Sequence, residues 1–116
     1  MDTKTILLVE DNEALLKVLS LRLSKFCHLV TASNGMEAWD ILKEHEFDFM
    51  VTDIEMPVMN GFELINKVRE AGIDIKIIVV SGRYDTFAIE DFQDLGITDC
   101  LEKPYSICKL LDIIGI

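Results

Sequence analysis

Apolar residues form three short runs along the chain, at residues 6–9, 47–51 and 75–80, which are interrupted only by Asp48 and Lys76. Each run is rich in β-branched or aromatic residues, which is typical of strands that are buried on both faces of a parallel sheet. Weaker patterns predict two further strands, at residues 28–32 and 98–101. The pattern therefore predicts five strands, with the core centred on the three apolar runs.

Between these strands, apolar residues recur at helical spacing. One stripe comprises Leu15, Val18, Leu19, Leu23 and Phe26, and a second follows the turn at residues 33–35 and comprises Ala38, Ile41 and Leu42. Further helices are expected at residues 62–70, 86–94 and 106–114. Gly72 and Gly96 stand just past two of these helices, where a left-handed residue commonly ends a helix.

Strand and helix patterns alternate five times, with no Pro- or Ser-rich linker between them. This alternation predicts a single α/β domain over residues 1–116, with a doubly wound parallel sheet of five strands and five helices. Right-handed crossovers favour the flavodoxin-like strand order 2-1-3-4-5 for such a sheet. A ligand site is then expected at the carboxyl ends of the strands.

The composition narrows the possible partners. The chain has 116 residues, of which 50% are hydrophobic and 28% charged, as in a globular protein. No apolar run reaches the length of a membrane span and no cleavable signal is visible, so we expect a cytoplasmic location and no membrane partner. The net charge of −10 argues against direct nucleic-acid binding.

The cysteines and histidines indicate no metal centre. Cys27, Cys100 and Cys108 are an odd count without a C-x-x-C pair, which predicts reduced and mostly buried thiols. His28 and His45 have no partner at metal-ligand spacing and receive no functional role.

Polar residues at the expected strand ends carry the candidate chemistry. Glu10 and Asp11 follow the first strand, and Asp53, Ser81 and Lys103 follow the third, fourth and fifth. Carboxylates held this close repel by about 4 kcal/mol per pair at an effective dielectric near 20, and a single lysine does not neutralise them. The cluster therefore predicts a cation, and carboxylate oxygens without His or Cys favour Mg²⁺.

The same groups suit phosphoryl chemistry. A carboxylate beside Mg²⁺, an ammonium group and a hydroxyl can attack a phosphoryl group, because each neighbour neutralises or hydrogen-bonds one of its oxygens. We assign Asp53 as the acceptor, and Glu10, Asp11 and Asp53 as metal ligands.

Four motifs strengthen this interpretation: LLVEDN at residues 7–12, TDIEMPVMNG at 52–61, VVSGR at 79–83 and EKPY at 102–105. Together they resemble the receiver domain of two-component response regulators, and the resemblance covers nearly the whole chain. The string D-x-x-M-P-x-M-x-G, with the other three motifs at suitable intervals, is a strong signal, and chance agreement is improbable.

The resemblance implies a role for each matching residue. Asp53 accepts the phosphoryl group from the phosphohistidine of a sensor kinase or phosphotransfer protein, and the backbone carbonyl of Glu55 completes the Mg²⁺ shell. Lys103 pairs with the phosphoryl group, Ser81 reorients to hydrogen-bond it, and a cis Lys103–Pro104 bond aims the lysine. The domain then alters its affinity for an output domain, a partner protein or a second copy of itself.

One position departs from the family pattern. Family members commonly carry an aromatic residue three positions before the lysine, whereas this chain has Cys100 there. Tyr84 and Tyr105 are candidates to replace it. Glu55 lies two positions after Asp53 and is expected to influence the lifetime of the acyl phosphate.

Two alternatives to a phosphoacceptor switch remain. A degenerate receiver would keep the fold only as a protein-binding module, although Glu10, Asp11, Asp53, Ser81 and Lys103 are all present. A hydrolase that forms an aspartyl phosphate is less favoured, because the chain has no room for a cap over a substrate. The switch catalyses its own phosphorylation and dephosphorylation but is not expected to be a metabolic enzyme.

Overall fold

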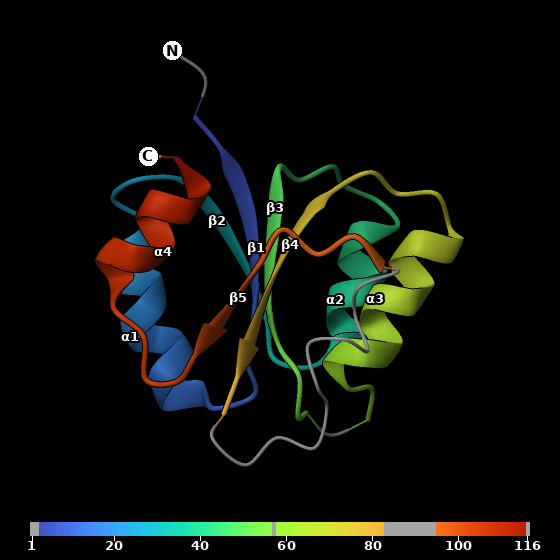
Figure 1. Cartoon of the computed structure of the whole chain (residues 1–116), viewed down its shortest axis with the longest axis horizontal. Coiled ribbons are helices and arrows are strands. Elements are labelled where there is room, and N and C mark those ends of the chain that lie inside the picture. The colour runs from blue at the N-terminus through green and yellow to red at the C-terminus, as the bar shows by residue number, and fades with distance from the viewer. Residues whose placement is uncertain (1–2, 57, 83–94, 116) are drawn as a thin grey trace.

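A single five-stranded parallel sheet forms the centre of the molecule. The computed structural model describes residues 3–56, 58–82 and 95–115, and its strands lie in the order β2-β1-β3-β4-β5 (Figure 1). They are β1 (Thr5–Val9), β2 (His28–Ala32), β3 (Phe49–Asp53), β4 (Lys76–Ser81) and β5 (Asp99–Glu102). The predicted strand order is confirmed, and so is the parallel pairing of every neighbouring pair of strands.

Helices cover both faces of this sheet. Within the described residues they are α1 (Glu13–Leu23), α2 (Gly35–Leu42), α3 (Gly61–Glu70) and α4 (Ile107–Ile114). Figure 1 shows α1 and α4 on one face and α2 and α3 on the other, which is the doubly wound arrangement. The helix expected at residues 86–94 lies outside the described residues, so four of the five expected helices are observed.

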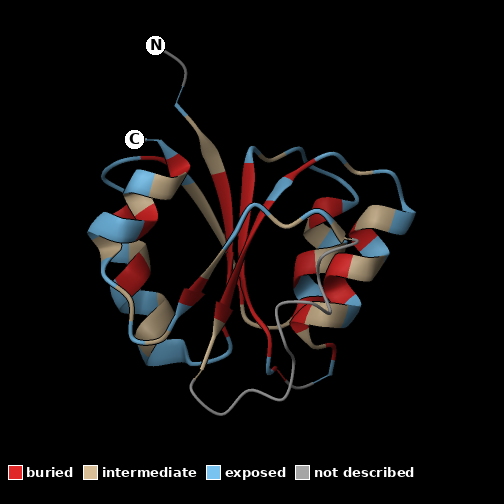
Figure 2. Cartoon of the chain, viewed as in Figure 1, coloured by how far each residue is buried: buried red, intermediate tan, exposed pale blue. Residues whose placement is uncertain are grey.

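Alternate residues of the central strands face opposite layers of the core. Leu7 and Val9 pack with residues of α2 and α3, whereas Ile6 and Leu8 pack with residues of α1 and α4. The central strands are therefore buried on both sides, as the red strands of Figure 2 show. This double burial explains why their sequences read as continuous apolar runs rather than as alternating ones.

Short polar side chains begin each described helix. Asn12, Asn34, Asn60 and Ser106 each accept a hydrogen bond from a backbone N–H of the first turn. Asn60 and Glu63 form a reciprocal capping box at the start of α3. These caps set the points at which the chain leaves the strand ends and enters a helix.

Two sequence expectations need correction. The third strand starts at Phe49 rather than at Phe47, because Asp48 pairs with the start of β1 through both its backbone N–H and its side chain before the ladder begins. The first helix ends at Leu23, and the apolar stripe assigned to it is only partly buried. Val18 is 50% exposed and Phe26, beyond the helix, is 48% exposed.

Gly72 lies just past the end of α3, as predicted, whereas the helix expected before Gly96 lies outside the described residues. Gly72 and Gly96 both have positive φ, of 74° and 65°.

Across the described ranges, none of the helices has both the length and the apolarity needed to span a bilayer.

Candidate functional site

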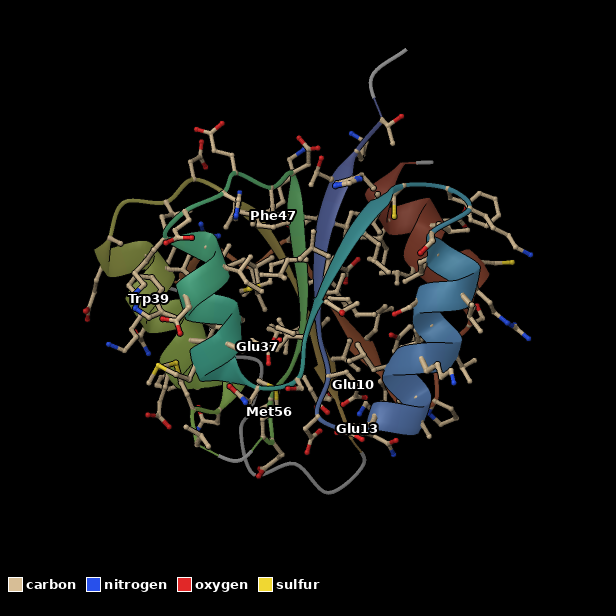
Figure 3. The ribbon with its side chains drawn as sticks, turned by 180° about the vertical axis from the view of Figure 1, so that it is seen from behind. Glu10, Glu13, Glu37, Trp39, Phe47 and Met56 are labelled. Carbon is tan, nitrogen blue, oxygen red and sulfur yellow. The ribbon has the colours of Figure 1, made fainter. Side chains whose placement is uncertain are left out.

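The parallel strands bring four of the five candidate residues to one edge of the sheet. Glu10 directly follows β1, Asp53 is the last residue of β3, Ser81 is the last residue of β4 and Lys103 directly follows β5. Because the strands are parallel, these carboxyl ends share one edge, at the lower side of Figures 1 and 3. Asp11 continues from Glu10 into the loop before α1.

Lys103 connects the two buried carboxylates. Its Nζ donates to Oε1 of Glu10 at 2.8 Å and to Oδ2 of Asp53 at 2.7 Å. The side chains of Glu10 and Asp53 are only 4% and 8% exposed, whereas that of Lys103 is 28% exposed. Lys103 is 93 positions from Glu10 and 50 positions from Asp53 in the sequence, so the fold brings three distant residues together in one charged cluster.

Three carboxylates lie close enough to share a cation. Ligand oxygens of Glu10, Asp11 and Asp53 all fall within 4.8 Å of one another, and Asp11 is exposed where the other two are buried. One ammonium group balances only part of this charge. The oxygen-only donor set, with an open side at Asp11, fits a hard divalent cation such as Mg²⁺ that keeps part of its water shell.

Burial and charge act against each other in this cluster. Burial raises the pKa of Glu10 to about 6, and the Lys103 hydrogen bond offsets only part of that effect. Burial lowers the pKa of Lys103, but the hydrogen bonds and charges of Asp53 and Glu10 outweigh it and hold the pKa above its usual range. The lysine therefore stays protonated at the site.

The backbone around Asp53 is tightly packed. Oδ1 of Asp53 accepts a hydrogen bond from the backbone N–H of Ile54 at 2.9 Å. Gly61, the first residue of α3, lies so close that a Cβ on it would stand 2.3 Å from the carbonyl oxygen of Asp53. Only glycine fits there. Gly61 is the last residue of the TDIEMPVMNG motif, but the motif gave no signal of this contact.

Ser81 shares the edge but not the cluster. Its hydroxyl lies 3.9 Å from the thiol of Cys100, a half-buried residue on β5. Among hydrogen bonds between described residues, none joins this hydroxyl to Asp53 or Lys103. The link to the cluster runs through the backbone, because the N–H of Lys103 donates to the carbonyl of Ser81 at 2.8 Å.

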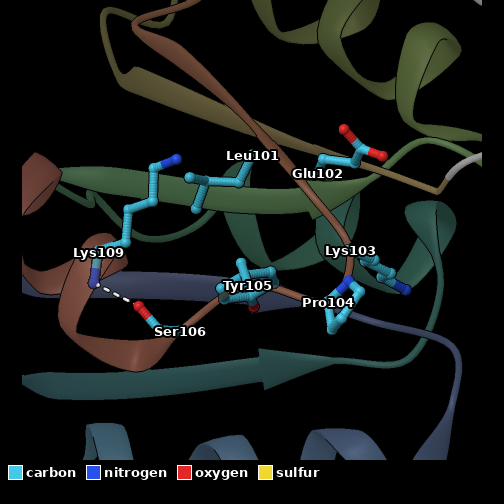
Figure 4. A pocket seen from close by; sticks show the side chains of 7 residues that line it. All are labelled: Leu101, Glu102, Lys103, Pro104, Tyr105, Ser106 and Lys109. Atoms are coloured by element: carbon cyan, nitrogen blue, oxygen red, sulfur yellow. Dashed lines mark hydrogen bonds between the residues drawn. The ribbon is translucent and has the colours of Figure 1, made fainter.

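The segment after β5 supplies a residue that sequence reasoning had only weakly implicated. The Lys103–Pro104 peptide bond is cis, as expected. Tyr105 follows it and lines a small cavity with Glu10, Asp53 and Lys103. On the outer side, residues 101–106 and Lys109 line a surface pocket of about 350 Å³, shown in Figure 4. The EKPY motif contained Tyr105, but nothing in it indicated that the phenol would line the same cavity as the two buried carboxylates.

The remaining candidates have simpler environments. Glu55 is exposed in the loop between β3 and α3. Tyr84 lies outside the described residues. The expectation of mostly buried thiols is wrong: Cys27 alone is buried, whereas Cys100 is half-buried and Cys108 is exposed on α4. The count and spacing of the cysteines carried no information on burial, and Cys108 belongs to the exposed face of α4.

Comparisons with known proteins agree on one family. The family model described as "Response regulator receiver domain" matches residues 6–115. The chain is 36% identical to the "Two-component response regulator 24" of Arabidopsis thaliana, over 95% of this chain and 81% of that protein. It is 30% identical to a "Chemotaxis protein CheY homolog" of Campylobacter jejuni, over 95% of this chain and 92% of that protein.

Longer relatives and solved structures add to this picture. The chain is 29% identical to the "DNA-binding transcriptional regulator NtrC" of Azospirillum brasilense, but it spans only 24% of that protein's length. A solved response regulator receiver protein from Pseudomonas putida superposes with a TM-score of 0.86 at 32% identity, covering 99% of this chain and 98% of its own.

Proposed function

The chain belongs to the response regulator receiver domain family of two-component systems, and on this basis we propose that it is a phosphoacceptor switch acting through Asp53. The observation that carries the proposal is the contact of the Asp53 carboxylate with Lys103, within 4.8 Å of the ligand oxygens of Glu10 and Asp11. The switch comprises one domain over residues 1–116 and works in the cytoplasm. It is not a metabolic enzyme.

Glu10, Asp11 and Asp53, with the backbone carbonyl of Glu55, would hold Mg²⁺. When bound, Mg²⁺ supplies positive charge to the phosphoryl oxygens and to the attacking carboxylate. Support comes from the charge of the site, since two buried carboxylates and the exposed Asp11 face one ammonium group.

In the transfer step, a carboxylate oxygen of Asp53 attacks the phosphorus of a phosphohistidine on a sensor kinase or phosphotransfer protein. The O–P bond forms, the P–N bond breaks, and the imidazole leaves. Lys103 is already 2.7 Å from Oδ2 of Asp53 and needs only a small movement to pair with a phosphoryl oxygen. The hydroxyl of Ser81 moves away from the thiol of Cys100 and donates a hydrogen bond to another phosphoryl oxygen.

The phosphorylated state then shifts the population towards a conformation with a different affinity for an output domain, a target protein or a second copy of the chain. Direct contact with nucleic acid or membrane is not part of this proposal. Residues near Ser81 and Lys103 carry the change, because both touch the phosphoryl group and the β4–β5 end of the sheet.

The test is incubation with acetyl phosphate and Mg²⁺, followed by intact-mass analysis. We expect one phosphoryl adduct on the native chain and none on Asp53→Asn. Asp40→Asn is the matched control, because Asp40 is an exposed aspartate on α2, and it should be labelled as fast as the native chain. An unlabelled native chain, as in a degenerate receiver, or an adduct that survives Asp53→Asn would contradict the proposal. Repeated turnover of phosphate monoesters would indicate a hydrolase instead.

A further inference from the structure

The outer edge of β2 is uncovered. In the order β2-β1-β3-β4-β5 this strand comes first, so it has a neighbouring strand on one side only. Figure 3 faces the other side, where β2 runs between α2 and α1 with no other described segment in front of it. Leu29, Val30 and Thr31, in the middle of the strand, are half-buried rather than buried. The edge is therefore accessible to another strand.

Two residues of β2 direct their backbone groups towards this edge. The N–H of His28 donates to the carbonyl of the residue before β1 at 2.9 Å, and the carbonyl of Ala32 accepts from the N–H of Glu10 at 3.1 Å. His28 and Ala32 therefore point their backbone groups towards the β1 side. Successive residues of a strand alternate in this direction, so Leu29 and Thr31 point theirs outward. Each of them offers an N–H donor and a carbonyl acceptor there.

The edge lacks the features that usually keep edge strands apart. The five residues of β2 include no Pro and no Lys, and they pair with β1 in an uninterrupted register. The strand lies within residues 26–36, which form the longest run of the sequence without Asp, Glu, Lys or Arg. Because the chain carries a net charge of −10, two copies repel each other in general. This uncharged edge is where they approach at the lowest electrostatic cost.

The side chains of β2 suit the approach of an identical strand. Val30 packs on the side of α2 and α3, where it lines a surface hollow of about 400 Å³ together with Ile41 and Phe47. Leu29 packs on the opposite side, with the residues of α1 and α4. Residues directly opposite each other in an antiparallel pair project from the same face of the sheet. A second Val30 opposite the first would therefore lie beside the hollow and cover part of its apolar lining.

We propose that two copies of the chain pair their β2 strands antiparallel, about a two-fold axis at Val30, and so join their sheets into one. Leu29 of each copy then lies opposite Thr31 of the other, and every outward N–H meets an outward carbonyl. The arrangement is symmetric and closed, so association stops at the dimer. It goes beyond the proposed function, because neither Asp53 nor a phosphoryl group takes part in it.

Amide hydrogen exchange of the native chain tests the backbone contacts without any substitution. It is measured by NMR in the absence of a phosphodonor, over a concentration series in which sedimentation velocity follows the change from monomer to dimer. We expect exchange of the Leu29 and Thr31 N–H groups to slow about tenfold as the dimer forms. Exchange of the Val30 N–H, which points towards β1, stays the same. A chain that sediments as a monomer throughout would overturn the proposal, and so would equal slowing at all three residues.

A pair of charge variants tests the two-fold axis. Val30→Lys and Val30→Glu each place like charges directly opposite one another, so each should raise the dissociation constant of the dimer at least about tenfold. An equimolar mixture of the two should form a heterodimer, because opposite charges then face each other. Val18→Lys is the matched control, since it makes the same change at a valine of α1 that is 50% exposed. It should dimerise as the native chain does.

A dimer that survives Val30→Lys would overturn the proposal. A dimer that Val18→Lys abolishes would also overturn it, because the contact would then belong to the outer face of α1. So would a mixture that stays monomeric although both Val30 variants melt as the native chain does. If the variants do not fold, the exchange rates of the native chain still decide. Failure of acetyl phosphate to label the chain contradicts the proposed function alone and leaves the dimer standing.

Discussion

The ammonium nitrogen of Lys103 lies 2.7 Å from Oδ2 of Asp53, although the two residues are 50 positions apart in the chain. The same nitrogen contacts Glu10 at 2.8 Å, so one side chain neutralises part of the charge of two buried carboxylates. The site is therefore also an element of stability, and its removal has consequences that are measurable without any phosphodonor.

Lys103→Met should lower the free energy of unfolding by about 2 kcal/mol, because it leaves Glu10 and Asp53 buried without their countercharge. Urea denaturation at neutral pH measures the loss, and Mg²⁺ should reduce it by supplying charge at the same place. Lys43→Met is the control. Lys43 pairs with Asp40 at 3.2 Å on the surface, and its loss should cost about 0.5 kcal/mol. Equal costs for the two variants would refute this assignment.

Gly61→Ala should destabilise the chain by about 2 kcal/mol, because a Cβ would stand 2.3 Å from the Asp53 carbonyl oxygen and force the backbone apart. It should also slow labelling by acetyl phosphate, since Asp53 must move. Gly72→Ala has open space around it and a φ of 74°, so it should cost about 1 kcal/mol and leave labelling unchanged. Native labelling of Gly61→Ala would show that the contact does not position Asp53.

Cys100 should affect phosphorylation only through Ser81, whose hydroxyl lies 3.9 Å from its thiol. We expect Cys100→Ala to free the hydroxyl and raise the rate of acetyl phosphate labelling about twofold, since a weak hydrogen bond is worth a fraction of 1 kcal/mol. In a Ser81→Ala background the same change should have no effect. A rate change that persists in that background would assign the role of Cys100 to packing alone.

Tyr105 should make the fold sensitive to alkali. Burial raises the pKa of its phenol from 10.0 to about 12. The unfolded chain loses this proton near pH 10 and the folded chain only near pH 12, so the stability from Tyr105 is complete below pH 10 and declines as the pH rises between these values. The decline amounts to at most about 3 kcal/mol.

Absorbance at 295 nm in a Tyr84→Phe background reports Tyr105 alone, because these are the two tyrosines of the chain. We expect a midpoint near pH 12 in the folded protein and near pH 10 in concentrated urea. Between pH 10 and pH 12, Tyr105→Phe should lose less free energy of unfolding than the native chain does. Identical midpoints in buffer and urea would contradict the buried position of the phenol.

Sequence patterns predicted the sheet well because its central strands are buried on both faces. Double burial requires continuous apolar runs, and β1, β3 and β4 have them. The boundary of β3 was less predictable, since Phe47 is apolar but precedes the point where Asp48 joins the start of β1. The burial of the apolar stripe on α1 was also overestimated. Periodicity alone does not distinguish apolar residues that pack on the sheet from apolar residues that face solvent.

The sequence alone determined which residues would meet at the site. Glu10, Asp53 and Lys103 follow parallel strands, and parallel strands place their carboxyl ends at one edge whatever the details of packing. The tertiary structure alone decided which of them touch. It placed Lys103 between Glu10 and Asp53, turned Ser81 towards Cys100 and pressed Gly61 against the Asp53 carbonyl. Such contacts depend on side-chain directions and loop closure across distant segments, which local patterns do not encode.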